Sequence, residues 1–511
     1  MLIQEFFTKI SKINPSKKAV VFDNDSITYE ELDKKTNILS NHLISVGLKK
    51  SEKVIIYIPK SVELFISFIS VLKSDAVYVP LNTKAPFDRN HEICKELKPT
   101  IILCNNDTFE SALEIKNSLK NKIKVINVDN KFDGSSKIIS YENKPHDIAY
   151  ILFTSGSTGK PKGVMITHDN IINYSKWCID FFKIIPDDKF TNFPGLFFDL
   201  SVFDIYPSLL AGSTIVVVPD NLLLFPLKLF NYLQIHKVTI WNSVPSLYSY
   251  ISNICDLTKI KINSIRLFTF NGEIMQVKTL KNWMSAYEDC RFVNQYGPTE
   301  ATCATLFFEV KDIPIILEES IPIGKPINGA EVFILDEYGK LISNSSEIGE
   351  LYIGGKGVAI GYFNDSQKTN SSFIKNPIDK FDENMFYKTG DLVQRLDNGN
   401  YVYIGRKDNQ IKFMGYRVEL GEIDCKLQSL TNVKNSATIF TKKKDWRESQ
   451  IVSFIVLNQK YSTSSIRNSL VKILPIYMIP KKFIILSDLP LNQNGKVDRN
   501  RLKDLYLNDK L

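Results

Sequence analysis

Several features of familiar catalytic and secreted proteins are scarce in this sequence. Histidine occurs five times in 511 residues, and no histidine lies in an obvious proton relay. The seven cysteines are scattered, and none belongs to a C-x-x-C pair. Because disulfide frameworks and zinc sites need paired or regularly spaced cysteines, neither is expected, and we predict that the thiols are reduced.

Long apolar segments are also missing. The run at 222–233 is interrupted by Pro226 and Lys228, and no stretch approaches the length of a transmembrane helix, about 18 apolar residues or more. The N-terminus has no basic start followed by an apolar region, which argues against secretion. We therefore expect a cytoplasmic protein.

The composition is that of a globular protein with an uneven charge. With 44% hydrophobic residues, the chain can bury a sizeable core and is expected to hold roughly two to four domains or subdomains. Its net charge is +8, yet residues 409–511 carry eighteen Lys and Arg against nine Asp and Glu, a net +9, which leaves −1 for residues 1–408. A basic segment fits nucleic acid, an acidic membrane or an acidic protein partner, although the lysines at 442–444 equally fit a solvated loop.

Helical and strand patterns alternate over the first half of the chain. Residues 27–47 begin with a capping box from Thr28 to Glu31 and end at Gly47, which predicts a helix. Further strands are expected at 53–58, 76–81, 100–104, 148–153, 213–218, 238–241 and 266–270, with helices at 61–73, 88–97, 108–119, 169–182, beyond 201 and at 226–236. Because such alternation favours parallel sheets with helices on both faces, we predict two doubly wound α/β subdomains.

The pattern changes after Ile321. Residues 321–406 consist of short alternating segments separated by Gly, Asn and Asp, which predicts a small β-rich subdomain. Beyond it, strands near 437–440, 450–456 and 483–486 and a helix near 464–473 predict a compact α+β domain. We therefore expect a large N-terminal domain at 1–407 and a small C-terminal domain at 408–511.

A glycine-rich loop follows the expected strand at 148–153. Its glycines, hydroxyl residues and lysines are Thr154, Ser155, Gly156, Ser157, Thr158, Gly159, Lys160, Lys162 and Gly163. Glycine lets backbone N–H groups approach an anion closely, and the other residues add donors and positive charge, so the loop fits a polyphosphate. A Walker A loop needs four residues between its glycines, whereas two separate Gly156 and Gly159, so P-loop kinases and GTPases are not expected. A polar surface turn is the alternative.

Nine segments carry a family resemblance: ITYEEL (27–32), LKSDAVYVPL (72–81), FTSGSTGKPKG (153–163), FDLS (198–201), NQYGPTE (294–300), GELYIGGKGVAIGYF (349–363), YKTGDL (387–392), GRKDNQIKFMGYRVELGEID (405–424) and NGKVDR (494–499). Over nearly its whole length the sequence resembles the adenylate-forming enzymes, in particular the amino-acid adenylation domains of nonribosomal peptide synthetases and the stand-alone D-alanine:D-alanyl carrier protein ligases. It departs from the family at 74–76, where SDA replaces a small A-G pair, and at 359–362, where AIGY replaces A-R-G-Y.

The resemblance implies that a carboxylate attacks the α-phosphorus of ATP and forms an acyl-AMP and pyrophosphate. Two anions react best when they are positioned and their charge is offset, so no nucleophilic Ser or Cys and no catalytic His is needed. By the resemblance, residues 154–162 hold the outgoing phosphates, Glu300 binds Mg²⁺, and Lys496 bridges the substrate carboxylate and the α-phosphate. The other implied nucleotide-binding residues are Asn294, Gln295, Tyr296, Gly297, Pro298, Thr299, Asp391, Tyr403 and Arg406. Among them, Tyr296 offers an aromatic face to adenine and Asp391 accepts both ribose hydroxyls.

The FDLS segment points to an amino acid as the cargo. Asp199 matches the aspartate that binds the α-ammonium group in amino-acid-activating relatives, and Phe198 stands where acyl-CoA synthetases and luciferases often have His. By family register, the cargo side chain is surrounded by Leu200, Phe203, Asn242, Thr269, Asn271, Gln295, Cys303 and Ala304. The D-alanyl ligases commonly carry Cys where this chain has Asn271, so D-alanine and a small L-amino acid both stay open. Some of the side-chain amides of Asn242, Asn271 and Gln295 could instead form hydrogen bonds with the backbone of this chain.

The resemblance also implies a partner. Asp408 matches the hinge about which the family's small domain moves between an adenylating and a thioester-forming orientation. The sequence stops a dozen residues after Arg499, so we expect the phosphopantetheine thiol to lie on a separate carrier protein, with this chain a monomer that binds no nucleic acid. An acyl-CoA synthetase and a non-catalytic module that docks carrier proteins are the alternatives.

Overall fold

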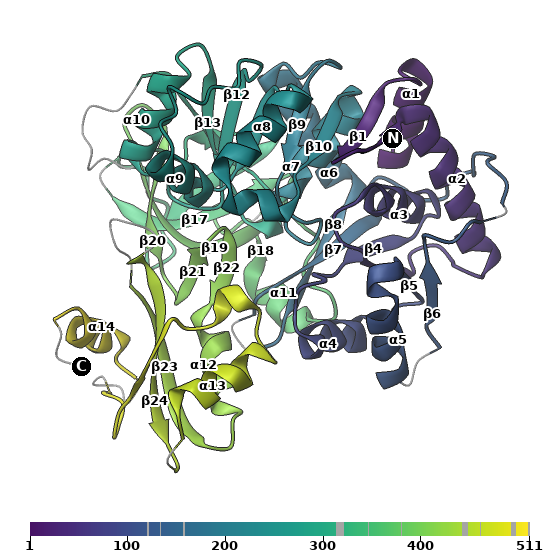
Figure 1. Cartoon of the computed structure of the whole chain (residues 1–511). Helices are drawn as coiled ribbons and strands as arrows, with labels where there is room; N and C mark the ends of the chain where they lie inside the picture. The colour runs from purple at the N-terminus through teal and green to yellow at the C-terminus, as the bar shows by residue number, and fades with distance from the viewer. Residues whose placement is uncertain are drawn as a thin grey trace. The chain divides into compact units, whose positions relative to one another are not determined.

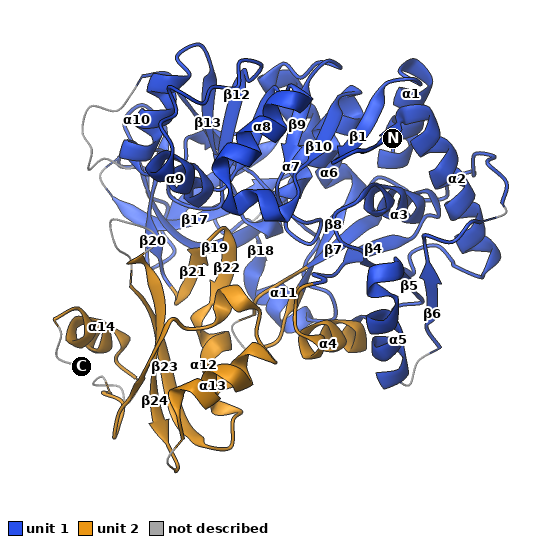
Figure 2. Cartoon of the chain, viewed as in Figure 1, with its two compact units in different colours: residues 1–83, 97–152, 163–407 blue, residues 84–96, 153–162, 408–511 orange. Residues whose placement is uncertain are grey.

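The structure is a computed structural model that describes residues 1–119, 122–132, 134–156, 159–312, 321–345, 347–379, 381–441, 448–459, 461–491 and 497–508. These residues form two compact units (Figure 2). Unit 1 comprises residues 1–83, 97–152 and 163–407, and unit 2 comprises residues 84–96, 153–162 and 408–511. The glycine-rich loop therefore belongs to the same unit as the C-terminal segment.

One sheet has six strands in the order β6-β5-β3-β4-β7-β8. Its strands are β3 (Lys53–Tyr57), β4 (Val77–Pro80), β5 (Ile101–Cys104), β6 (Lys124–Asn127), β7 (Ile148–Thr154) and β8 (Lys162–Thr167). The pairs β3–β4, β3–β5, β5–β6 and β4–β7 are parallel, as the alternating pattern predicts.

Helices accompany these strands in the chain: α2 (Tyr29–Ser45), α3 (Val62–Lys73), α4 (Phe87–Leu97) and α5 (Phe109–Ser118). The capping box of α2 is confirmed: the Thr28 hydroxyl accepts from the Glu31 N–H at 3.2 Å, and the Glu31 carboxylate accepts from the Thr28 N–H at 2.9 Å. These bonds satisfy two N–H groups that a helix start leaves without partners.

A second sheet has nine strands in the order β15-β14-β13-β12-β11-β9-β10-β1-β2 (Figure 1). Its strands are β1 (Lys18–Phe22), β2 (Asp25–Thr28), β9 (Lys189–Asn192), β10 (Thr214–Val217), β11 (Ile240–Ser243), β12 (Leu267–Asn271), β13 (Arg291–Tyr296), β14 (Leu306–Val310) and β15 (Lys325–Pro326). The six strands from β13 to β1 are parallel, whereas β2, β14 and β15 run antiparallel to their neighbours. The N-terminal strand β1 thus joins the second sheet, which the local pattern did not predict.

The helices of this part of the chain are α1 (Ile3–Ile13), α6 (His168–Phe182), α7 (Ser201–Ala211), α8 (Pro226–His236), α9 (Pro245–Ile254) and α10 (Val277–Ala286). Helix α7 is buried over most of its length. This burial explains its run of apolar residues and makes its one acidic residue, Asp204, conspicuous.

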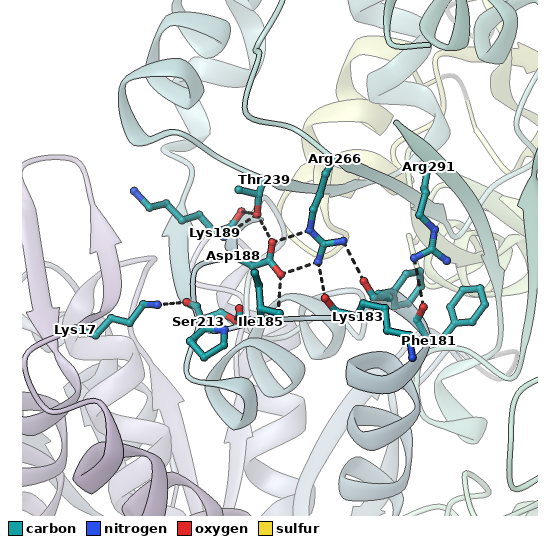
Figure 3. Close-up of polar contacts among 12 residues, drawn as sticks. Lys17, Phe181, Lys183, Ile185, Asp188, Lys189, Ser213, Thr239, Arg266 and Arg291 are labelled. Carbon is teal, nitrogen blue, oxygen red and sulfur yellow. Dashed lines mark hydrogen bonds and ion pairs between the residues drawn. The ribbon is translucent and has the colours of Figure 1, made fainter. Parts of the chain in front are cut away.

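Two arginines hold the C-terminal end of α6, where backbone carbonyls lack helical partners (Figure 3). Arg266 donates to the carbonyls of Phe182 at 3.0 Å and Lys183 at 3.1 Å. It also binds the buried Asp188 carboxylate through Nε at 2.8 Å and Nη2 at 2.6 Å. Arg291 donates to the Phe181 carbonyl at 3.3 Å. The positive charges lie at the negative end of the helix dipole and fix α6 against β12 and β13.

The predicted β-rich subdomain is confirmed. It is a five-stranded sheet of β16 (Ala330–Leu335), β17 (Ile348–Gly355), β18 (Phe373–Lys375), β19 (Met385–Arg395) and β20 (Tyr401–Arg406), with antiparallel pairing throughout. Helix α11 (Ser366–Ser372) precedes β18. Short antiparallel strands follow from the alternating residues and the intervening glycines and asparagines.

The C-terminal segment forms a small α+β fold within unit 2. Strands β21 (Gln410–Phe413) and β22 (Tyr416–Glu419) form a hairpin, and β23 (Val433–Thr441), β24 (Gln450–Leu457) and β25 (Lys482–Ile485) form a three-stranded sheet. Its helices are α12 (Leu420–Gln428), α13 (Thr463–Val471) and α14 (Arg499–Leu507). Asp424 on α12 accepts from Arg499 and Thr438 at 2.6 Å each, which ties α12 to α14 and β23. The lysines at 442–444 lie outside the described residues.

Candidate active site

The glycine-rich loop in unit 2 requires glycine for its shape. A Cβ atom on Gly156 would lie 2.0 Å from the Lys160 carbonyl oxygen, and Gly159 has a φ of +81°. The Gly159 N–H donates to the Gly156 carbonyl at 3.0 Å, so the loop closes on itself. A loop of this kind presents backbone N–H groups without side chains in the way, which is the property that a phosphate-binding loop needs.

The donors of this loop contact the C-terminal segment of the same unit. The Ser155 hydroxyl donates to the Arg417 carbonyl at 2.7 Å, and the Gly156 N–H donates to Glu422 Oε2 at 3.2 Å. Arg89 donates to the other Glu422 oxygen at 2.7 Å. Burial raises the pKa of the Glu422 carboxyl, and Arg89 opposes that rise. The Gly156 N–H, which the family resemblance assigns to phosphate, is thus bonded to Glu422.

The other loop residues differ in exposure. The Thr154 hydroxyl is buried and has no hydrogen-bond partner among the described residues, so it remains available to an anion. Lys160 is exposed, and Lys162 is half-buried at the start of β8. Ser157 and Thr158 lie outside the described residues.

In unit 1, the FDLS segment (198–201) and the NQYGPTE segment (294–300) meet directly. The Thr299 hydroxyl donates to Asp199 Oδ2 at 2.5 Å. Thr299 begins a short 3₁₀ helix just after β13, and Asp199 precedes α7. Position 297, two residues before Thr299, requires glycine, because a Cβ there would lie 2.7 Å from both Ala304 Cα and the Cys303 carbonyl oxygen. Asn294 is held by its donation to the Pro322 carbonyl at 2.8 Å.

A second cluster joins β13 to the β-rich subdomain. Asp391 is buried, its Oδ2 accepts from the Tyr296 hydroxyl, and its Oδ1 accepts from Arg406 Nη1 at 2.8 Å. Burial, followed by the nearby Asp391 charge, raises the pKa of Tyr296 well above its ordinary value, so the phenol stays a donor. Tyr403 lies on β20 near Tyr296. The two carboxylate oxygens of Asp391 have further lone pairs that can accept ribose hydroxyls.

Glu300 is fully buried, and its Oε1 accepts from the Tyr362 hydroxyl at 2.7 Å. Over the described part of the chain, no group of three or more His, Cys, Asp or Glu side chains could hold a metal ion. Mg²⁺ is usually bound through one or two carboxylates, with phosphates and water completing its shell. A single buried carboxylate therefore fits Mg²⁺ that arrives with a nucleotide.

Polar side chains form a row at the carboxyl ends of three parallel strands. Asn242 on β11 donates to Asp204 Oδ1 at 2.8 Å, and Asn192 on β9 donates to Asp204 Oδ2 at 3.1 Å. Thr269 on β12 donates to the Asn242 side-chain oxygen at 2.9 Å. Burial raises the pKa of Asp204 well above its ordinary value, although both amides oppose that rise. Three strands and α7 thereby share one hydrogen-bond network.

The row continues onto β13. Gln295 is paired in register with Asn271 and accepts at Oε1 from the Tyr174 hydroxyl of α6 at 2.9 Å. Asn271 approaches the Cys303 carbonyl at 3.5 Å and its sulfur at 3.8 Å. Burial raises the pKa of the Cys303 thiol, and the Asp199 charge raises it further, so Cys303 lies within electrostatic range of Asp199.

The apolar residues that the resemblance assigns to the cargo side chain are buried or half-buried. Phe203 is buried on α7, where its ring contacts Phe182 at 5.4 Å and Phe190 at 5.7 Å between centroids. Leu200 and Ala304 are buried, and Phe198 is half-buried. Phe203 is thus part of the core of unit 1.

Residues 7–363 match the family model described as AMP-binding enzyme. The chain belongs to the AMP-binding enzyme family. The match covers both large sheets and ends in the residue after Tyr362, the partner of Glu300.

Curated relatives of this AMP-binding enzyme are peptide synthases. The chain is 32% identical over 506 residues to gramicidin S synthase 2 of Brevibacillus brevis, covering 98% of this chain and 11% of that protein. It is 32% identical over 497 residues to surfactin synthase subunit 3 of Bacillus subtilis, covering 97% of this chain and 38% of that protein. The chain thus spans well under half the length of both relatives.

Solved structures share the fold. Holo-PA1221, a nonribosomal peptide synthetase protein that contains adenylation and PCP domains, matches with a TM-score of 0.85 at 26% identity, covering 98% of this chain and 84% of that one. The Vibrio cholerae adenylation domain AlmE, solved with glycyl-adenosine-5′-phosphate, matches with a TM-score of 0.87 at 23% identity, covering 99% and 98%. The protein is an adenylate-forming enzyme of the nonribosomal adenylation type and an AMP-forming ligase.

Two residues of the AMP-binding enzyme remain to be placed. Lys496 lies outside the described residues. Asp408 is the first residue of the C-terminal segment in unit 2, and its Oδ1 accepts from the Gln410 N–H at 3.1 Å. The described helices include none long and apolar enough to cross a membrane.

The sequence pattern missed several polar residues at this site. Tyr174, Asp204 and Tyr362 each bond to a residue that the family resemblance had named, and Asn192 bonds to Asp204. Asp204 alone left a signal, because an acidic residue in an apolar helix needs a buried partner. Tyr174 and Tyr362 could not be found from the sequence, since their partners lie 121 and 62 positions away in the chain.

Proposed function

We propose that this chain activates an amino acid with ATP and transfers it to a phosphopantetheine thiol on a separate carrier protein. A carboxylate oxygen of the amino acid attacks the α-phosphorus, the bond to the β-phosphate breaks, and pyrophosphate leaves. The thiol sulfur then attacks the acyl carbon of the aminoacyl-AMP, and AMP leaves. The amino acid is small, with D-alanine and L-amino acids as competing candidates.

The observation that carries this proposal is the bond between Thr299 and Asp199. It joins the residue proposed to bind the α-ammonium group to the residue proposed to bind the α-phosphate. A carboxylate at this position is costly to desolvate unless a cation arrives, and an ammonium group is such a cation. An amino acid held by Asp199 would therefore carry its carboxylate beside the nucleotide.

The other residues act on the nucleotide. Asp391, fixed by Tyr296 and Arg406, would accept the ribose hydroxyls, and the glycine-rich loop would hold the outgoing phosphates. Glu300 would hold Mg²⁺, which offsets phosphate charge when bound. Lys496 would add a positive charge between the substrate carboxylate and the α-phosphate.

The experiment is ATP:pyrophosphate exchange with a panel of amino acids, each matched with the acid that lacks the amino group. We expect exchange to require the amino group. Exchange with the amino-free acids alone would contradict the proposal and favour an acyl-CoA synthetase. Loading of a phosphopantetheinylated carrier protein, with free CoA as the competing acceptor, tests the second step.

A further inference from the structure

The polar row formed by Asn192, Asn242, Thr269, Asn271 and Gln295 is closed at one end. The side chains of Asn192, Asn242 and Thr269 all donate to another member of the row or to Asp204, at 2.8 to 3.1 Å. The Asn242 oxygen accepts from Thr269, and its nitrogen donates to Asp204. This amide is therefore satisfied by the protein, and it has little capacity left for cargo.

The row is open at its other end, on Gln295. This side chain is only 2% exposed, and its Nε2 has no hydrogen-bond partner among the described residues. Its Oε1 accepts from Tyr174, which orients the amide so that the N–H groups point away from that hydroxyl. A buried amide nitrogen without an acceptor costs about 1–3 kcal/mol, a factor of about 5 to 150 in an equilibrium constant, so a folded protein retains one where an acceptor arrives.

Asn271 lies next to Gln295 on the same face of the sheet. The two residues are register partners in the parallel pair β12–β13, so their side chains project to the same side. The Asn271 contacts with Cys303, at 3.5 Å to oxygen and 3.8 Å to sulfur, are long for hydrogen bonds. Two neighbouring amides therefore offer N–H donors near the Cys303 thiol, which lies within range of the Asp199 charge.

We infer that the cargo amino acid carries a hydrogen-bond acceptor on its side chain, and that Gln295 selects for it. This inference rests on the proposed function, in which Asp199 holds the α-ammonium group. An acceptor oxygen of a hydroxyl or carboxamide group would pair with the Gln295 N–H, whereas a methyl or isobutyl group would leave it unpaired. Serine, threonine and asparagine thus fit better than alanine, valine and leucine.

The test compares amino acids of matched shape in ATP:pyrophosphate exchange, using both enantiomers of each. The pairs are threonine with valine, asparagine with leucine, and serine with alanine. In at least one pair, we expect the acceptor-bearing member to have the higher kcat/KM by about 5- to 150-fold, the cost of an unpaired buried donor. A preference for the apolar member in every pair would overturn the inference.

Variants of Gln295 test whether this residue causes the preference for an acceptor-bearing side chain. Gln295→Met keeps the length of the side chain but removes the donor, so the ratio within the preferred pair should fall toward one. Gln295→Glu, which removes the N–H donors while keeping the shape, should lower the ratio as well and serves if the Met variant does not fold. Gln234→Met, on the exposed face of α8, is the matched control and should keep the wild-type ratio. A folded Gln295 variant with an unchanged ratio would refute the assignment.

Failure of the proposed function gives a different result. In that case no amino acid of either enantiomer supports exchange, while an amino-free acid does. The selectivity within the matched pairs is read only from amino acids, so the two failures are distinguishable.

Discussion

Three aspartates of unit 1 have different partners: Asp391 and Asp204 are buried, and Asp199 is half-buried. Asp391 accepts hydrogen bonds from the Arg406 guanidinium and the Tyr296 phenol. Asp204 faces two amides, and burial raises its pKa well above the ordinary value. Asp199 accepts from the Thr299 hydroxyl and is the proposed partner of the cargo ammonium group. Residue type alone therefore does not set the role of a carboxyl group at this site.

Asp199→Ala tests the ammonium contact. Removing one partner of a buried charge pair costs roughly 2–5 kcal/mol, so amino-acid-dependent exchange should fall by about 30-fold or more. ATP binding, measured with a fluorescent nucleotide, should persist because the nucleotide keeps its other contacts. Asp180→Ala, on the exposed face of α6, is the control. An unchanged apparent affinity for the amino acid in the Asp199 variant would show that the contact is wrongly assigned.

His168 makes stability depend on pH. Burial lowers its pKa to about 4, although Asp147 opposes that change. An unfolded histidine has a pKa near 6.5, so between about pH 6.5 and 4 the unfolded chain binds more protons than the folded chain. Stability from neutral His168 is therefore present above this window and is lost as pH falls through it, by up to about 3 kcal/mol.

Urea unfolding at several pH values measures this effect. In His168→Gln, the unfolding free energy should depend less steeply on pH between 6.5 and 4 than in the wild type. Comparison of the two proteins cancels the contributions of other titrating groups. Equal slopes would mean that His168 does not carry this pH dependence.

At the scale of elements, helix α6 is held by two arginines at its end and contacts a residue of the candidate active site. Its C-terminal end is held by Arg266 and Arg291, and Tyr174 in its middle donates to Gln295. The helix therefore needs a fixed position along β12 and β13 for this hydrogen bond to form.

Arg266→Met tests this clamp. The substitution leaves the buried Asp188 without its arginine, and breaking such a pair costs about 3 kcal/mol or more. Chemical denaturation should show a loss of this size. Lys259→Met removes a lysine from an ion pair with Asp256; the Lys259 side chain is 80% exposed, so this control should cost little. If both variants are equally stable, the clamp does not hold α6.

Elements with strong local signals could be predicted from the sequence. The helix at 27–47 carries its own capping box and forms α2 with the expected bonds. Strand β11 begins at Ile240, two residues later than expected. The pairing of β1 with β10 joins residues almost 200 positions apart, and no local pattern encodes such a contact. A separation of 121 positions likewise concealed the Tyr174–Gln295 bond.

At the scale of the whole molecule, the proposal assigns two half-reactions to one chain with a hinge at Asp408. Asp408→Pro should slow thioester formation more than adenylation, since proline fixes φ at that residue. Asp408→Ala removes the bond to Gln410 without fixing φ and is the control. Equal loss of both half-reactions in the proline variant would contradict the hinge.

The charge of residues 409–511 gives a second prediction at this scale. A net +9 would complement an acidic carrier protein and steer it electrostatically. Carrier loading should therefore weaken as ionic strength rises, whereas ATP:pyrophosphate exchange should respond much less. If carrier loading does not change with ionic strength, the basic residues of this segment form an ordinary solvated surface and do not steer a carrier protein.

The central claim is that this chain joins an amino acid to AMP. The most direct measurement is mass spectrometry of the adenylates formed when the protein is incubated with ATP, Mg²⁺ and a mixture of amino acids and their amino-free counterparts. The account predicts an aminoacyl-AMP whose side chain carries an acceptor oxygen. Adenylates formed only from amino-free acids would contradict it.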